Sequence, residues 1–387
     1  MTLRSLPPDV RRGTTRAVPR PSGRLDLVLL LAVGSLIGLG ALLVWSATRQ
    51  RMLDAGLAPT TFLQRHLVNA AVGVALGSLA ALVDYRSLQA YAPVVYGGAL
   101  LGLVAVLTPL GRTINGAHSW IVLGGGFQVQ PAELAKVALV VGLATMLSAE
   151  REGPPPSRDV LLALALAAVP MALIMLQPDL GTVLVLVVVV LGVLAISGAR
   201  AGWIVGLLVA GAAVCVTAVQ VGVLDQYQVD RFAAFANPAL DPRGVGYNTN
   251  QARIAIGSGG LTGKGLFQGT QTAGRFIPEQ QTDFVFTVAG EELGLAGASL
   301  LLLLLGVVLW RGLRVAGRSP DMFGRLVAAG VVSWFAFQSF VNVGMTLGIM
   351  PVTGLPLPFV SYGGSSMFAC LVAVGLLQGV HRRSTVR

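Results

Sequence analysis

The chain has 387 residues, of which 54% are hydrophobic and only 11% are charged, and its formal net charge is +10. A soluble domain carries about a quarter charged residues, so this composition excludes an ordinary soluble enzyme and indicates a polytopic helical membrane protein. The charge does not indicate a nucleic-acid partner, because the cations are 25 Arg and 2 Lys that gather mainly at the ends of apolar segments.

The chain begins with an Arg- and Pro-rich segment, and we expect a disordered cytoplasmic arm at residues 1–24. The pair Arg11-Arg12 is not followed by the short apolar stretch and small-residue site of a cleaved signal peptide. The apolar segment 25–47 is long enough to cross a bilayer, so we expect it to be a retained membrane anchor.

Apolar stretches long enough to cross a bilayer recur along the chain and predict an all-α membrane protein. We predict ten spans, at residues 25–47, 62–83, 92–110, 131–149, 159–176, 180–197, 202–223, 284–310, 322–349 and 363–380. Together they form a single membrane domain at 25–380, followed by a cytoplasmic tail at 381–387. Glycine pairs at four-residue spacing are expected to bring helices close together. These pairs are Gly34/Gly38, Gly73/Gly77, Gly98/Gly102 and Gly202/Gly206.

The arginines predict the orientation of this bundle. Seventeen lie in the arm, the tail and the loops on one side, against four in the short loops on the other side. Because positive charge is retained in the cytoplasm, both termini are predicted to be cytoplasmic. The one long polar loop, at 224–283 between the seventh and eighth spans, is then extracytoplasmic, where nucleotide cofactors are scarce.

Three polar features lie at the outer ends of the third to sixth spans. Trp120 lies in an outer loop, where it is either an interfacial anchor or a platform that stacks on a sugar. Glu133 and Lys136 share one helix face at the start of the fourth span. They form either a structural ion pair or a polar wall of a substrate cavity, with Lys136 available to a phosphate. Asp179 is expected to cap the sixth span.

The long loop carries a glycine-rich turn at 257–265. It fails the phosphate-loop pattern, because Ser258 replaces the first Gly and Gly265 follows Lys264 where Ser or Thr is required. Its exposed amides and Lys264 remain compatible with a lipid diphosphate.

At the end of the long loop, Asp283 precedes the eighth span, where the helix dipole favours an ionised carboxylate that can accept a proton. Glu291 and Glu292 follow within the span and point about 100° apart, so we expect only one of them to face the cavity. The two cysteines and three histidines show no metal-ligand spacing, and no metal site of the chain's own is predicted.

The ninth span and the following loop read NVGMTLGIMPVTGLPLPFVSYGGSS at 342–366. Further patterns are QPAELAK at 130–136, QPDLGT at 177–182, GYNTNQARIAIGSGGLTGKGLFQGTQ at 246–271 and PEQQTDFVFTVAGEELG at 278–294. Together they closely resemble the SEDS family (shape, elongation, division and sporulation) over nearly all of the chain beyond the arm. The stretch PVTGLPLPF at 351–359 resembles elongation-type members, with division-type members as the alternative.

The resemblance implies a ten-span glycosyltransferase that polymerises lipid II outside the cytoplasmic (inner) membrane, paired with a class B penicillin-binding protein. The family's essential carboxylate corresponds to Asp283, its outer-loop tryptophan to Trp120, and its Glu/Lys pair to Glu133 and Lys136. Three positions depart from the family pattern: Ala132 stands for Ser, Gln281 for His and Ser119 for Arg. The missing Arg puts in doubt that the loop around Trp120 grips a diphosphate alone.

In the implied reaction, a GlcNAc 4-hydroxyl attacks C1 of MurNAc and displaces undecaprenyl diphosphate with inversion. Asp283 is the expected base. The expected substrate-binding residues are Trp120, Glu133, Lys136, Arg253, Lys264, Arg275, Glu291 and Ser361. A divalent cation, Mg or Mn, could bridge the substrate diphosphate, and no nucleotide cofactor is expected. The alternatives are a lipid II flippase and a scaffold that only recruits a transpeptidase.

Overall fold

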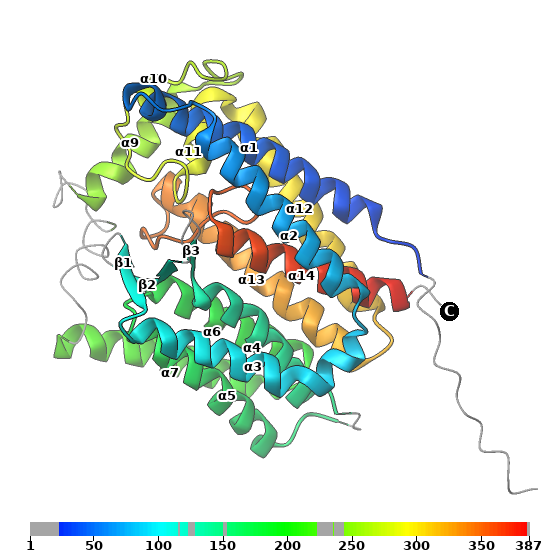
Figure 1. Ribbon diagram of the computed structural model, residues 1–387. Helices are drawn as coiled ribbons and strands as arrows, with labels where there is room; N and C mark the ends of the chain where they lie inside the picture. Colours follow the sequence, from blue (N-terminus) through cyan, green and yellow to red (C-terminus); the bar gives the residue numbers. More distant parts are fainter. Residues whose placement is uncertain are drawn as a thin grey trace, which may run out of the picture.

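The computed structural model describes residues 23–114, 117–122, 128–149, 153–222, 235 and 244–384. The arm predicted at 1–24 and the first half of the loop predicted at 224–283 lie almost wholly outside these ranges. Most of the described chain is helical, as Figure 1 shows. The elements are α1 Leu27–Asp54, α2 Thr61–Leu82, α3 Tyr85–Leu107, β1 Gly111–Ile114, β2 Ala117–Val122, β3 Gln128–Val129, α4 Pro131–Leu147, α5 Ser157–Met175, α6 Leu180–Ile196, α7 Ala201–Val221, α9 Val245–Ser258, α10 Thr270–Ala273, α11 Val285–Glu292, α12 Gly294–Arg318, α13 Met322–Leu347 and α14 Gly364–Ser384.

Each of the ten predicted spans overlaps a helix. Among the described residues, seven helices are long and apolar enough to cross a membrane, namely α1, α2, α3, α5, α12, α13 and α14. Helices α4 and α6 have 17 residues each, a length of about 25 Å at 1.5 Å per residue. The protein is therefore a multi-pass membrane protein, and the count of ten spans stays a prediction.

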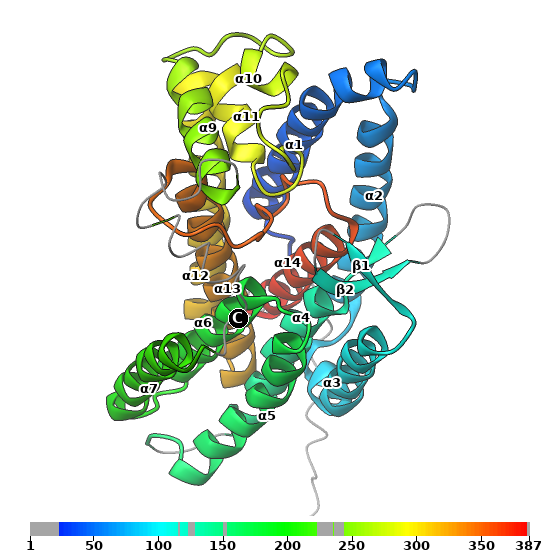
Figure 2. The same cartoon turned by 90° about the vertical axis from the view of Figure 1, so that its left-hand side faces the viewer.

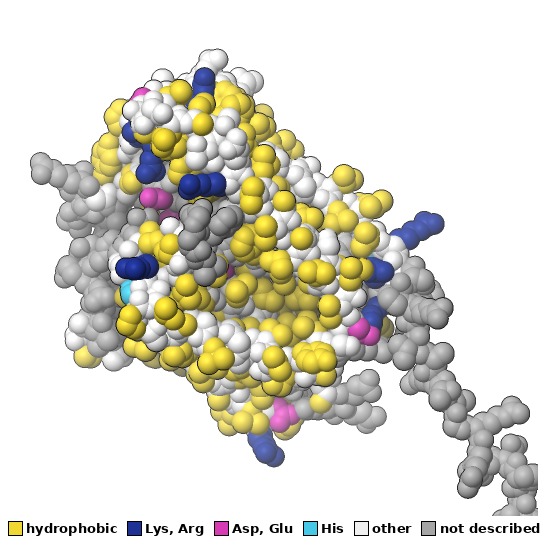
Figure 3. All heavy atoms as spheres, viewed as in Figure 1, with side chains coloured by type: hydrophobic (Ala, Val, Ile, Leu, Met, Phe, Trp, Pro, Cys, Tyr) yellow, Lys and Arg dark blue, Asp and Glu magenta, His cyan; other side chains and the backbone are white. Residues whose placement is uncertain are grey.

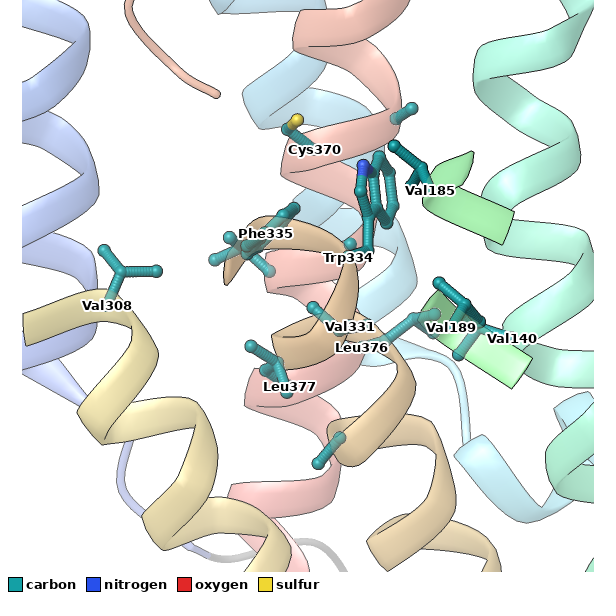
Figure 4. Close-up of a cluster of buried hydrophobic side chains, with 14 of the residues drawn as sticks. Val140, Val185, Val189, Val308, Val331, Trp334, Phe335, Cys370, Leu376 and Leu377 are labelled. Atoms are coloured by element: carbon teal, nitrogen blue, oxygen red, sulfur yellow. The ribbon is translucent and has the colours of Figure 1, made fainter. Parts of the chain in front are cut away.

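The helices pack around α13 and α14, whose apolar windows are 72% and 78% buried. Figure 4 shows Trp334 and Phe335 of α13 among aliphatic side chains from α4, α6, α12 and α14. The packing role predicted for Gly73/Gly77 is confirmed, because a Cβ at Gly77 would lie 2.5 Å from the Leu371 carbonyl oxygen. The same role is wrong for Gly34/Gly38 and Gly202/Gly206, since a Cβ there would meet nothing within 4 Å.

The all-α prediction is wrong for the loop after α3, which forms a three-stranded antiparallel sheet in the order β1-β2-β3. Ile114 of β1 pairs with Ala117 of β2, and the two residues between them in the sequence are Asn115-Gly116. Asn-Gly between β-prone residues is the strongest short-range hairpin signal, and this pair is the sequence feature that indicates the hairpin. The sheet places Trp120 on β2.

The eighth span, predicted to be continuous at 284–310, is broken between α11 and α12. Gly294 adopts a left-handed φ of +65° at the break. The glycine-rich turn lies against the break and satisfies its backbone groups. Lys264 N and Gly265 N donate to the carbonyl oxygens of Glu291 and Glu292 at 3.0 Å each. In the other direction, Leu295 N and Ala296 N donate to residues 260 and 261. The amides of Lys264 and Gly265 therefore bind the broken helix instead of a phosphate.

Replacing Gly294 by Ala should disrupt the contact between the glycine-rich turn and the break between α11 and α12. A Cβ at Gly294 would lie 2.3 Å from the Gly263 nitrogen, and the left-handed backbone adds about 1–2 kcal/mol of strain. We expect a lower midpoint of thermal unfolding in detergent and faster proteolysis of the 259–275 segment. Gly34→Ala is the matched control, because nothing lies within 4 Å of its Cβ position. Equal stability of the two variants would contradict this account of the break.

Candidate functional site

Asp283 lies in the turn that immediately precedes α11. In Figure 2, α11 lies above the loop that joins α13 to α14, and strands β1 and β2 lie to one side of that loop. The backbone N–H of Asp283 donates to the Glu279 carbonyl at 3.2 Å, and its side chain is half-buried. A Cβ at Gly354 would lie 3.5 Å from Asp283 Oδ2. The carboxylate therefore faces the loop 351–363, which joins α13 to α14.

Three residues tie the Asp283 segment to its surroundings. Asn342 Nδ2 of α13 donates to the Asp283 carbonyl oxygen at 2.8 Å. Ser361 Oγ donates to the Thr282 carbonyl oxygen, and Tyr362 N donates to the Gln281 carbonyl oxygen at 2.8 Å. Ser361, which is 5% exposed, thus contacts the backbone next to Asp283, and its Oγ also accepts a hydrogen bond from Leu357 N at 2.8 Å.

Glu133 and Lys136 form the predicted ion pair, with Lys136 Nζ 2.7 Å from Glu133 Oε1. Lys136 is completely buried, and its ammonium also donates to Gln338 Oε1 at 3.0 Å. It lies over the Trp334 ring, 4.9 Å from the ring centroid. Every one of these partners belongs to the protein core, so the geometry favours the ion-pair interpretation over a direct phosphate contact.

Glu291 is also completely buried and binds the long loop. Its carboxylate accepts hydrogen bonds from Lys264 Nζ at 2.9 Å and from the backbone N–H groups of Gln271 and Thr272 at 2.8 and 2.9 Å. It therefore caps the short helix α10 from a distant position in the chain.

Glu292 points to the other side and joins α11 to α1. It accepts a hydrogen bond from Ser46 Oγ at 2.6 Å and another from Phe267 N at 3.2 Å. The side chains of Glu291 and Glu292 point in different directions, as expected for adjacent positions on a helix. Both are nevertheless buried, and both bind residues of the 264–272 segment.

The remaining cations predicted to bind substrate lie on the surface. Arg275 pairs with Asp54 at the end of α1, and Arg253 is exposed on α9. Arg49, which the motifs did not single out, stacks over the Phe267 ring at 5.1 Å. Figure 3 shows Lys and Arg side chains at the margins of a broad hydrophobic band. Of the predicted cations, Arg253 and Arg275 are thus better placed than Lys136 to meet a solvent-side anion.

The sheet adds an aromatic group and a cation next to each other. Trp120 of β2 is half-buried and stands opposite Arg112 of β1 in the strand register. Arg112 is exposed, so a cation is present in this loop although Ser119 replaces the family's Arg. Ser365 ties the sheet to α14, since its Oγ accepts from Gln130 N at 2.8 Å and donates to the Gln128 carbonyl at 3.2 Å.

Two further polar residues lie around the 351–363 loop. Asp179 caps α6, as predicted, by accepting from Thr182 N at 2.9 Å. His66 of α2 stacks on Tyr362 at 6.4 Å between ring centroids and is completely buried, and neither ring nitrogen has a hydrogen-bond partner in the described part of the chain. Metal-ligand spacing does not identify His66, whereas its position as a polar residue inside an apolar span is the available signal.

Among the residues that the structure describes, no group of three or more His, Cys, Asp or Glu side chains could hold a metal ion. The carboxylates near the loop are engaged differently: Glu291 and Glu292 bind the protein backbone, and Glu133 binds Lys136. A divalent ion at this site would therefore need most of its ligands from the substrate.

Residues 27–386 match the family model FTSW_RODA_SPOVE, described as cell cycle protein. The peptidoglycan glycosyltransferase MrdB of Escherichia coli K12 is 37% identical over 359 residues, covering 92% of this chain and 93% of MrdB. The probable peptidoglycan glycosyltransferase FtsW of Thioalkalivibrio sulfidiphilus is 38% identical over 374 residues, covering 94% of this chain and 91% of the relative.

Two solved structures share the fold. One belongs to a peptidoglycan synthase complex that coordinates polymerization and crosslinking, with a TM-score of 0.77 and 35% identity over 94% of this chain and 99% of the other. The other is the rod shape determining protein RodA of Thermus thermophilus, with a TM-score of 0.69 and 34% identity over 94% of this chain and 98% of the other.

Proposed function

The chain belongs to the FtsW, RodA and SpoVE family of cell cycle proteins, the SEDS family, and on that premise we propose that it polymerises lipid II with Asp283 as the general base. The protein is a peptidoglycan glycosyltransferase, and it is a multi-pass membrane protein. The proposal that Asp283 is the base rests on the surroundings of its carboxylate and its backbone. A half-buried carboxylate faces the 351–363 loop, while hydrogen bonds from three other residues hold its own and the two preceding backbone carbonyls.

The chemistry requires one proton transfer and one leaving group. The acceptor 4-hydroxyl attacks C1 of the donor sugar, and Asp283 takes the hydroxyl proton as the new C–O bond forms. The bond from C1 to the diphosphate oxygen breaks, and undecaprenyl diphosphate leaves with the electron pair. An acid that is partly open to solvent and fixed through its backbone suits this role, because a base must reach its proton without reorganising.

We propose that Arg253, Arg275 and Arg112 face the departing diphosphate, and that Trp120 stacks on a sugar ring. Behind these residues, the ion pairs Glu133–Lys136 and Glu291–Lys264 stabilise the protein. A divalent ion such as Mg or Mn would neutralise diphosphate charge, and its ligands would come mainly from the substrate. The distribution of arginines supports a site on the extracytoplasmic side of the inner membrane, within a ten-span topology.

The test is polymerisation in the absence of a membrane. Purified protein in detergent, given lipid II, is expected to produce glycan strands that are visible on gels after labelling. A flippase has no barrier to cross under these conditions and would produce no polymer. A scaffold would likewise be inactive unless a partner supplied the polymerase. Absence of polymer, both alone and with a crosslinking partner, would contradict the proposal.

A transpeptidase of the class B penicillin-binding type is the proposed partner, and the similarity to a synthase complex supports it. We also propose the elongation role over the division role, since residues 351–359 read PVTGLPLPF and the fold resembles RodA. Depletion in the native cell is expected to turn rods into spheres. Filaments with blocked septa would instead assign the protein to division.

A further inference from the structure

Helix α13 buries a stripe of groups with hydrogen-bonding capacity along one face. Trp334, Gln338 and Asn342 follow one another at intervals of four residues, and none of the three has any exposed surface. Burial of an amide side chain in an apolar span is unfavourable unless hydrogen bonds replace those made with water. The partners of these amides therefore show what the stripe does.

Gln338 is held in a single orientation. Its Oε1 accepts from Lys136 Nζ at 3.0 Å and from Trp334 Nε1 at 2.6 Å. Because two donors face the oxygen, the NH2 end must point the other way, where Nε2 donates to the Pro356 carbonyl at 2.7 Å. The ion pair on α4 is thereby connected to the middle of the 351–363 loop.

Asn342, one turn further along, joins two segments that are distant in sequence. Its Nδ2 donates to the Asp283 carbonyl at 2.8 Å and to the Leu355 carbonyl at 2.7 Å. Both protons of the amide are used on backbone oxygens, and Asn342 Oδ1 has no hydrogen-bond partner among the residues that the structure describes. An apolar side chain at position 342 would leave no buried oxygen unpaired. What the Asn342 amide contributes to the structure is therefore its two donated hydrogen bonds.

We propose that Gln338 and Asn342 are positioning residues that set the place of Asp283 relative to the 351–363 loop. This inference rests on the proposed role of Asp283 and deepens it. Neither amide is exposed, so neither touches substrate; both act through the backbone. Glu133 and Lys136 then influence catalysis by orienting Gln338, which gives these two residues a role in the site without contact with a diphosphate.

The experiment measures steady-state polymerisation of lipid II by full-length protein in detergent, with the partner present if the wild type needs it. The variants are Asn342→Leu, which removes both donated bonds, and Ser361→Ala, which removes the independent bond to Thr282. Ser339→Ala is the matched control, because Ser339 is buried on the same helix and lines the apolar groove between α12 and α13. Asp283→Asn and the double variant Asn342→Leu/Asp283→Asn complete the set.

A misplaced base should slow the reaction without weakening substrate binding. We expect kcat of Asn342→Leu to fall about tenfold to hundredfold, with KM for lipid II unchanged within about twofold. Ser361→Ala should show a smaller decrease of the same kind, and it keeps the test valid if Asn342→Leu fails to fold. Because Asn342 acts through Asp283, the double variant should be no slower than Asp283→Asn alone.

The possible outcomes separate this proposal from the proposed function. If Asp283→Asn is inactive while Asn342→Leu and Ser361→Ala keep the wild-type kcat, the positioning role is overturned and the base assignment stands. A raised KM with unchanged kcat would replace positioning by direct substrate contact. Full activity of Asp283→Asn would overturn both the base assignment and the positioning role.

Discussion

Asp283→Asn is expected to reduce lipid II polymerisation by at least about a hundredfold, the lower end of the contribution of a general base. The amide keeps the size of the carboxylate but cannot take the proton of the attacking hydroxyl. The backbone around residue 283 is held by Asn342, Ser361 and Tyr362 through main-chain oxygens, which the substitution leaves in place. Expression and membrane insertion should therefore be normal, as measured by quantitative blotting of membrane fractions.

The matched control for this variant is Asp159→Asn, which makes the same change in the first turn of α5, at the predicted cytoplasmic end of the span 159–176. It should polymerise lipid II at the wild-type rate. Equal activity of Asp283→Asn and wild type would remove Asp283 from the reaction. A raised KM with kcat retained would make Asp283 a binding group instead of a base.

The sequence was informative where a single local rule decides the structure. Apolar length predicted the positions of the spans, and Asp179 followed the rule that short polar side chains cap helices. The Glu133/Lys136 pair followed from three-residue spacing on one helix. The helix dipole at the start of an apolar helix favours an ionised Asp283, but its assignment as the base comes from the family resemblance and stays a prediction.

Tertiary partners explain what the sequence could not predict. Gly294 follows Glu291-Glu292 inside the predicted eighth span, and nothing local shows that the turn at 259–265 satisfies a break there. The sequence of the turn at 259–265 is compatible with an anion-binding site. It does not show that amides of this turn donate to the carbonyl oxygens of Glu291 and Glu292 and are therefore not free to bind an anion. Gln338 and Asn342 were visible as polar residues within a span, but their partners come from three other segments of the chain.

Lys136→Met is expected to destabilise the protein strongly. Glu133 is only 2% exposed, and the substitution removes the positive charge with which its carboxylate pairs. Breaking a buried ion pair in this way costs about 3–5 kcal/mol of folding free energy. Stabilities of folded proteins are about 5–15 kcal/mol, so we expect a clearly lower unfolding midpoint in detergent and a lower yield from membranes. The readout is thermal unfolding, followed by intrinsic fluorescence.

The double variant Glu133→Gln/Lys136→Met separates the two interpretations of this pair. Removing both charges leaves no uncompensated ion, so most of the lost stability should return. Trp334 Nε1 still orients Gln338 in the double variant, and any remaining decrease in kcat measures what Lys136 adds to the positioning of the loop. If Lys136 instead bound the substrate diphosphate, Lys136→Met would fold like the wild type and raise KM. The double variant would then not restore KM, because a neutral pair cannot replace a cation that contacts a phosphate.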